Sequence, residues 1–125
     1  MVKDDYIMRM IHEMIQAVLT LLLGRDTESK EEIVLPETTQ DEEFQKLIHL
    51  VNEGRINDAE NQLWDLLDKD QARHFQMALL FYDHLNDLED DVLEAADFSR
   101  EEVADGLVRV MKLYGYEDMA RTFIL

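Results

Sequence analysis

The sequence predicts an all-α protein, and three observations lead to that fold class. The 125 residues include only one Pro and four Gly, so helix breakers are sparse. Leu, Glu, Asp and Ala are the commonest residues, a mixture that favours helices over short strands. Apolar residues also recur at helical spacing in almost every segment. With 46% hydrophobic residues, the chain has enough apolar material for one continuous core.

The first predicted element is an amphipathic helix in residues 1–24, with Gly24 as a natural helix end. Its apolar stripe is wide and rich in methionine, which provides adaptable surface of the type used at interfaces. We expect the stripe to make contacts through Met8, Ile11, Met14, Ile15, Val18 and Leu22. Two alternatives are open: the stripe docks within its own chain, or it forms a homodimer.

Residues 25–40 are predicted to be a linker, because they begin with a polar stretch and contain the only proline, Pro36. A connection of this length is unusual inside a compact domain. It allows the first helix to dock at some distance or to swap onto a neighbouring molecule. Residues 41–125 are predicted to form a separate domain of helical hairpins.

The most informative stretch of that domain is residues 54–60, which predicts a tight turn between two antiparallel amphipathic helices. Gly54 ends the first of these helices. Capping-box patterns, in which a short polar side chain precedes a Glu by three residues, are typical of helix starts. Thr39 with Glu42 forms one such pattern before the first helix, and Asn57 with Glu60 forms another before the second.

The rest of the chain is predicted to be helical as well. Asp70 is expected to cap a long helix with two apolar stripes, which indicate a central helix with neighbours on both sides. A short helical turn is expected in residues 90–96. Ser99 with Glu102 is a third capping box, and the helix that it opens ends at Gly115. Residues 117–125 supply a short last helix, which gives about six helices in all.

The turn at Gly54 and the small Ala59 after it resemble the turn and second helix of a tetratricopeptide repeat. In that family a glycine ends the first helix, and a small residue lets the second helix approach closely. Gly115 and Ala120 reproduce the same spacing. The resemblance implies a pair of tetratricopeptide-like hairpins, and the long interval between the two glycines departs from a regular array.

Over nearly its full length, the chain also resembles a group of small, uncharacterised, all-helical proteins of Gram-positive bacteria. The similarity lies in residues 6–9, 52–60 and 114–117. That group has no assigned activity, so the resemblance implies the fold and leaves the function open.

Charge and composition restrict the kinds of partner. Twenty-nine acidic and twelve basic side chains give a formal net charge of −17, which repels phosphate backbones and anionic lipid headgroups. We therefore expect no direct nucleic-acid binding and no membrane role. The purest apolar run, residues 17–23, is far shorter than the roughly 20 residues that a membrane span requires. The absence of Cys and of a basic leader favours the cytoplasm.

No pattern typical of catalysis or metal binding is found in the sequence. The four His residues lie on different predicted segments, and none follows a Glu by three residues. The acidic run in residues 83–91 lacks the glycine of an EF-hand loop, and a solvated helix face explains it. An enzyme that uses carboxylates and a divalent metal is the least favoured hypothesis. We expect no catalytic residue, no cofactor and no metal site.

These observations favour a non-catalytic protein–protein interaction module that holds a protein or peptide partner and self-associates as a homodimer. Exposed aromatic side chains in a groove are common contact residues. The aromatic residues expected to play this part are Trp64, Tyr82, Tyr114 and Tyr116. The alternative is an acidic mimic of nucleic acid that occupies a nucleic-acid-binding protein, since complementary charge would give fast association.

Overall fold

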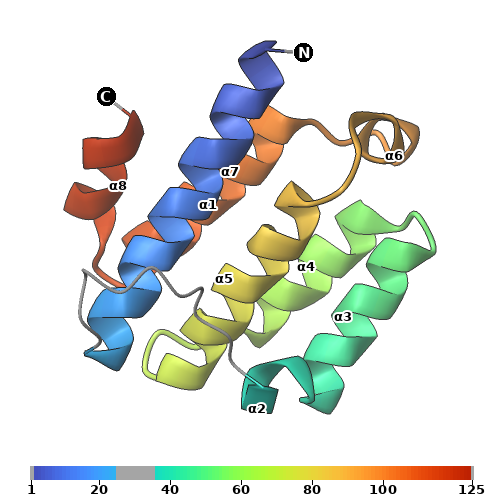
Figure 1. Cartoon of the computed structure of the whole chain (residues 1–125). Coiled ribbons are helices and arrows are strands. Elements are labelled where there is room, and N and C mark those ends of the chain that lie inside the picture. The colour runs from blue at the N-terminus through green and yellow to red at the C-terminus, as the bar shows by residue number, and fades with distance from the viewer. Residues whose placement is uncertain (1, 25–35, 125) are drawn as a thin grey trace.

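The computed structural model describes residues 2–24 and 36–124, and this part of the chain is all-helical (Figure 1). The prediction of an all-α fold is confirmed. The eight helices of the described part are α1 (Val2–Leu23), α2 (Pro36–Thr39), α3 (Glu42–Asn52), α4 (Ile56–Leu66), α5 (Ala72–Asn86), α6 (Asp90–Ala95), α7 (Arg100–Leu113) and α8 (Glu117–Ile124). The prediction of about six helices is too low, mainly because the four-residue α2 lies inside the predicted linker. Residues 25–35 of that linker lie outside the described residues.

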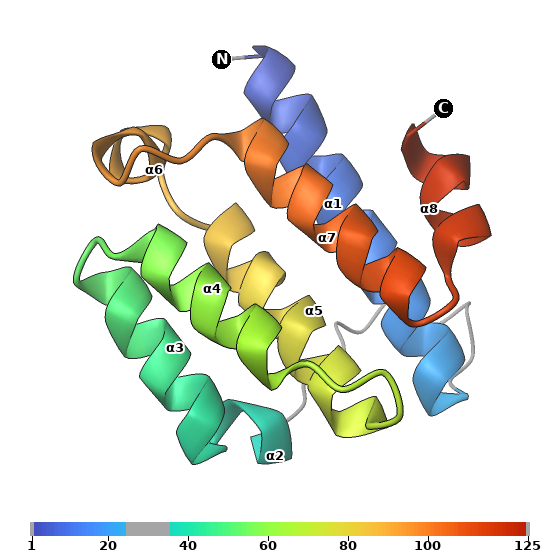
Figure 2. The ribbon, with the colours of Figure 1, turned by 180° about the vertical axis from the view of Figure 1, so that it is seen from behind.

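Helix α5 lies at the centre of the fold, as its two apolar stripes predict. It contacts α1 and α7 on one side and α2 and α3 on the other. Figures 1 and 2 show this arrangement from opposite directions, with α8 beside α1 and α7, and α4 beside α3. The buried residues of α5 are Phe75, Met77, Ala78, Leu79, Phe81, Tyr82, Leu85 and Asn86. One continuous core cluster therefore joins both halves of the chain.

Helix α1 docks within its own chain, against α5, α7 and α8. Its core-facing residues have no exposed surface: Ile11, Met14, Ile15, Val18 and Leu19. The side-chain amide nitrogen of Asn86 donates a hydrogen bond of 2.8 Å to the backbone carbonyl of Met8, and this bond fixes α1 along α5. Of the two alternatives for the apolar stripe, the structure has the one in which it docks within its own chain and belongs to the common core. The same burial leaves these five residues no free surface for a dimer.

One helix in residues 2–24 and 36–124 is long and apolar enough to cross a membrane by length and composition alone. It is the stretch Tyr6–Leu23 of α1, which is longer than the apolar run 17–23 noted in the sequence. A core helix passes the same test of length and composition. The core-facing side of this stretch is the buried stripe of α1.

Two antiparallel hairpins, α3–α4 and α7–α8, have a glycine in the turn (Figure 2). Gly54 has a φ of 80° and Gly115 a φ of 87°, which is the left-handed region that favours glycine. Both glycines therefore end the preceding helix as predicted. Ala59 has no exposed surface and Ala120 has 1%, so a small residue lies buried in the second helix of each hairpin.

The predicted helix caps are only partly confirmed. The Ser99 hydroxyl accepts a hydrogen bond of 3.1 Å from the backbone amide of Glu102, as the capping-box pattern predicts. Helix α3 is capped by Asp41 instead of Thr39, which is the last residue of α2. The start of α5 has Gln71 at the cap position with no side-chain cap, and α4 similarly has Arg55. The predictions for Thr39, Asn57 and Asp70 are wrong.

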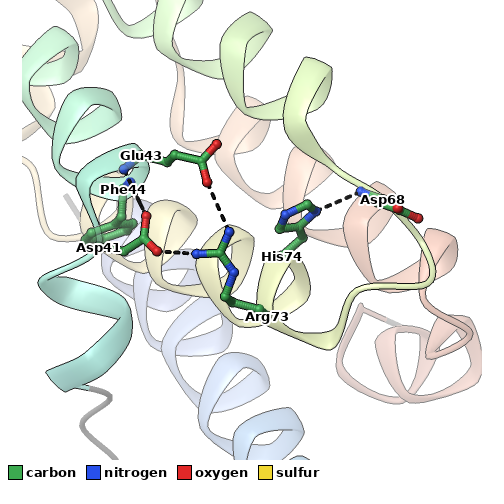
Figure 3. Close-up of polar contacts among 6 residues, drawn as sticks. All are labelled: Asp41, Glu43, Phe44, Asp68, Arg73 and His74. Atoms are coloured by element: carbon green, nitrogen blue, oxygen red, sulfur yellow. Dashed lines mark hydrogen bonds and ion pairs between the residues drawn. The ribbon is translucent and has the colours of Figure 1, made fainter.

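Asp41 also joins α3 to α5, as Figure 3 shows. One of its carboxylate oxygens accepts hydrogen bonds from the backbone amides of Glu43, at 2.8 Å, and Phe44, at 3.4 Å. The other oxygen pairs with the guanidinium of Arg73 in α5, which also donates a bond of 3.0 Å to the Glu43 carboxylate. The His74 imidazole accepts a bond of 3.1 Å from the backbone amide of Asp68. The first turn of α5 is thus tied to α3 and to the α4–α5 loop.

Replacing Asp41 separates its two roles. Asp41→Ala removes the helix cap and should lower the free energy of unfolding by about 1 kcal/mol. Asp41→Asn keeps an oxygen for the cap and loses only the charge opposite Arg73, so its loss should be smaller. Urea denaturation followed by circular dichroism measures both. Equal losses in the two variants would show that the ion pair, and not the cap, stabilises this corner.

Candidate functional site

A surface hollow of about 560 Å³ lies between α4 and α7. Figure 2 shows both helices on the near side of the molecule, with α5 behind them. The lining residues are Glu60, Glu102, Asp105, Val108 and Arg109. Glu102, Asp105 and Arg109 recur at a spacing of about one helical turn and so share one face of α7, with Val108 beside Arg109. Three carboxylates against one guanidinium make this hollow negatively charged.

Tyr82 of α5 connects the helices that form the hollow. Its hydroxyl donates a hydrogen bond of 2.7 Å to the Glu60 carboxylate. The same oxygen accepts a bond of 3.1 Å from the indole nitrogen of Trp64. Tyr82 itself has no exposed surface, and 15% of the Glu60 side chain is exposed. One buried hydroxyl therefore holds both Glu60 and Trp64 of α4 in place.

The environment of Tyr82 keeps its hydroxyl protonated. Burial raises the pKa of Tyr82 far above its ordinary value, and the negative charge of Glu60 raises it further. The hydrogen bond to Glu60 acts in the same direction, whereas Trp64 and Arg109 oppose the shift. The hydroxyl is therefore a permanent donor to Glu60 near neutral pH.

Gly106 of α7 makes room for the Tyr82 ring. A Cβ atom at this position would lie 2.5 Å from Cε1 and from the hydroxyl oxygen of Tyr82. Glycine inside a helix costs about 1 kcal/mol of stability relative to alanine. The close packing of α7 on the Tyr82 ring, which only glycine allows, offsets this cost. The contact was not predicted from the sequence. An isolated glycine inside a helical pattern is the signal that could have indicated it.

Arg109 lines the hollow, and its guanidinium lies over the ring of Trp64. The Arg109 guanidinium carbon lies 5.4 Å from the centre of the Trp64 ring, which is within the range of a cation–π contact. A guanidinium nitrogen lies 3.8 Å from the Glu60 carboxylate, too far for a hydrogen bond. The Arg109 side chain is 62% exposed. It is therefore held more loosely than Trp64, whose nitrogen is bonded and whose ring is partly buried.

The ten predicted contact residues do not form one surface. Those with no exposed surface are Ile11, Met14, Ile15, Val18 and Tyr82. Those that are partly buried are Met8, Leu22, Trp64, Tyr114 and Tyr116. Of the ten, only Tyr82 and Trp64 belong to the cluster beside the hollow.

Tyr114 and Tyr116 serve packing at the other end of α7. The ring of Tyr114 stacks on Phe75, with centres 4.4 Å apart and planes at 8°. Its hydroxyl donates a hydrogen bond of 2.8 Å to the backbone carbonyl of Asp68. The Tyr116 ring lies 5.3 Å from the same Phe75 ring. Both tyrosines thus fix the α7–α8 turn to the start of α5.

The sequence analysis does not predict that the lining residues of the hollow lie together, although it does predict the helices that carry them. Glu60 and Glu102 were assigned only to capping patterns, and Asp105 and Arg109 were not singled out. Their approach depends on how α4 packs beside α7, which local spacing does not encode. Within residues 2–24 and 36–124, no three His, Asp or Glu side chains are grouped so that they could hold a metal ion. The absence of a catalytic centre and of a cofactor stays a prediction.

Comparison with known proteins places the chain in a family. The sequence profile of a family of unknown function, DUF6483, matches residues 1–115. The chain belongs to DUF6483. The match spans α1 to α7 of this DUF6483 member and includes every residue that lines the hollow. The predicted resemblance to an uncharacterised family is confirmed in that respect. The search of curated proteins found no match to the chain, and neither did the search of solved structures.

Replacing Tyr82 with Phe tests the polar cluster through its pH dependence. At neutral pH the variant leaves Glu60 and the Trp64 nitrogen without their partner, which should cost about 2 kcal/mol of unfolding free energy. Because the folded pKa of Tyr82 is raised, the native protein should lose stability above about pH 10, by up to about 1.4 kcal/mol per pH unit from this group. The variant lacks that loss, so the difference between the two proteins should shrink as pH rises.

Urea denaturation of both proteins between about pH 9 and about pH 11 measures the difference. If the difference in unfolding free energy between the two proteins stayed constant or grew over that range, it would contradict the raised pKa of the buried hydroxyl.

Gly106→Ala should destabilise the fold, although alanine is the better helix former. Overpacking against the Tyr82 ring should lower the unfolding free energy by about 1–3 kcal/mol, whereas the higher helix propensity of alanine should raise it by about 1 kcal/mol. The exposed neighbour Asp105→Ala is the matched control, since it changes helix propensity without a clash. Thermal and urea unfolding show whether the substitution lowers or raises the free energy of unfolding. A variant more stable than the native protein would show that the ring moves aside freely.

Proposed function

We propose that this protein is a non-catalytic protein–protein interaction module whose contact site is the hollow between α4 and α7. The observation that carries the proposal is Trp64, whose ring lies beneath Arg109 of the hollow lining while its nitrogen is fixed to buried Tyr82. Tryptophan is enriched among the residues that dominate binding energy at interfaces. An aromatic ring already held in place loses little freedom on binding, which favours affinity.

The two hairpins support a tetratricopeptide-like architecture as part of this proposal. Each has a glycine with positive φ in its turn and a buried alanine in its second helix. Helical hairpins of this kind stack to present extended surfaces to other polypeptides. Self-association and a cytoplasmic location stay predictions from the sequence.

Nucleic-acid mimicry has weaker support. Such mimicry needs carboxylates in ordered rows along one face. Exposed carboxylates are spread over seven of the eight helices in the described part of the chain, all except α5. A spread of this kind serves solubility equally well. No observation singles out one acidic face, so a polypeptide partner is the function that we propose.

Blocking the hollow should abolish partner binding. Tagged native chain should capture a protein from a lysate of its own cells, and Asp105→Trp should reduce that capture at least about tenfold by filling the site. Asp118→Trp is the matched control, because it makes the same exchange at an exposed position on α8. Quantitative mass spectrometry compares the three baits after their folds are checked by circular dichroism. No captured protein, or equal capture by both variants, would contradict the proposal.

A further inference from the structure

We infer that the hollow between α4 and α7 binds an arginine side chain from a basic segment of a partner protein. This inference rests on the proposed function and names the class of partner. Three features lead to it: the charge of the lining, the Trp64 ring beside Arg109, and the position of Arg109 between that ring and Glu60.

The charge of the hollow favours a cationic occupant. Glu60, Glu102 and Asp105 supply three carboxylates, and Arg109 is the one basic side chain in the lining. The formal charge of −17 on the chain attracts a basic segment from a distance and speeds its association. The same field opposes an anionic ligand such as a phosphate group.

Arg109 shows how a guanidinium fits this site. Its guanidinium carbon lies over the Trp64 ring at 5.4 Å, and a nitrogen faces the Glu60 carboxylate at 3.8 Å. Ring and carboxylate thus flank a cation from two directions. Because this ion pair is longer than a hydrogen bond and the side chain is 62% exposed, a partner's arginine can displace it at low cost.

The geometry favours arginine over lysine. A guanidinium is planar, stacks on an aromatic ring, and donates two parallel hydrogen bonds to one carboxylate. A lysine ammonium is a compact, strongly hydrated charge that lacks this fork. Glu102 and Asp105, about one helical turn apart on α7, supply carboxylates for such donors, although Glu102 also accepts a bond of 3.3 Å from the Ser99 hydroxyl. Val108, about one turn beyond Asp105, can contact the arginine stem.

The chain contains a single tryptophan, so fluorescence excited at wavelengths where its four tyrosines do not absorb reports on Trp64 alone. The probe is an acetylated and amidated peptide of consecutive arginines, titrated into the native chain at about 0.15 M salt to limit long-range attraction. We expect a saturable change in Trp64 fluorescence, with affinity at least about fivefold higher than for a lysine peptide of the same length.

Two matched double variants separate the site from the overall charge. Glu102→Gln with Asp105→Asn should weaken binding at least about tenfold. Glu94→Gln with Asp118→Asn removes the same formal charge from exposed positions on α6 and α8, and should change affinity less than about twofold. Arg109→Ala should strengthen binding more than Arg121→Ala does, because only Arg109 lines the hollow.

Equal weakening by the two double variants, or equal affinity for arginine and lysine peptides, would overturn the inference. Competition distinguishes this failure from failure of the proposed function. If Asp105→Trp abolishes capture of a cellular partner that the arginine peptide does not displace, the function stands and the partner class is wrong. If no partner is captured and the peptide does not bind, both are wrong.

Discussion

Burial of α5 on several sides is the constraint on which the other features depend. Eight of its fifteen residues are buried, so helices from both ends of the chain must pack around it. Among those eight is Tyr82, whose hydroxyl enters the core and requires polar partners there. Glu60 and Trp64 supply them from α4, and Gly106 lets α7 approach the ring. The surface between α4 and α7 is therefore shaped by the packing of a buried tyrosine.

The same arrangement fixes the protonation state of the Tyr82 hydroxyl and the positions of its two partners. A hydroxyl whose pKa is raised by burial and by Glu60 keeps its proton throughout the physiological range. Its hydrogen bonds hold a carboxylate and an indole in fixed positions. Glu60 therefore lines the hollow already ordered, and the indole lies beneath Arg109, whose exposed side chain is held more loosely.

Much of the fold follows from the sequence, because long amphipathic patterns and turn glycines act locally. The two stripes of α5, the helix ends at Gly54 and Gly115, and the Ser99 cap are examples. The cap of α3 was misplaced because both Thr39 and Asp41 precede that helix, and spacing alone does not choose between them. Helices α4 and α5 begin without any side-chain cap, which local spacing does not reveal. The site was less predictable. Tyr82 and Glu60 are 22 positions apart, so their contact depends on tertiary packing.

The position of α1 has a consequence for synthesis. This helix is synthesised before the helices that cover it, which are α5, α7 and α8 from the second half of the chain. The α3–α4 hairpin pairs neighbours in sequence and can close while translation continues. The stripe from Ile11 to Leu19 cannot be fully covered until α7 and α8 have emerged. During synthesis it is therefore exposed apolar surface, whereas the folded molecule buries it completely.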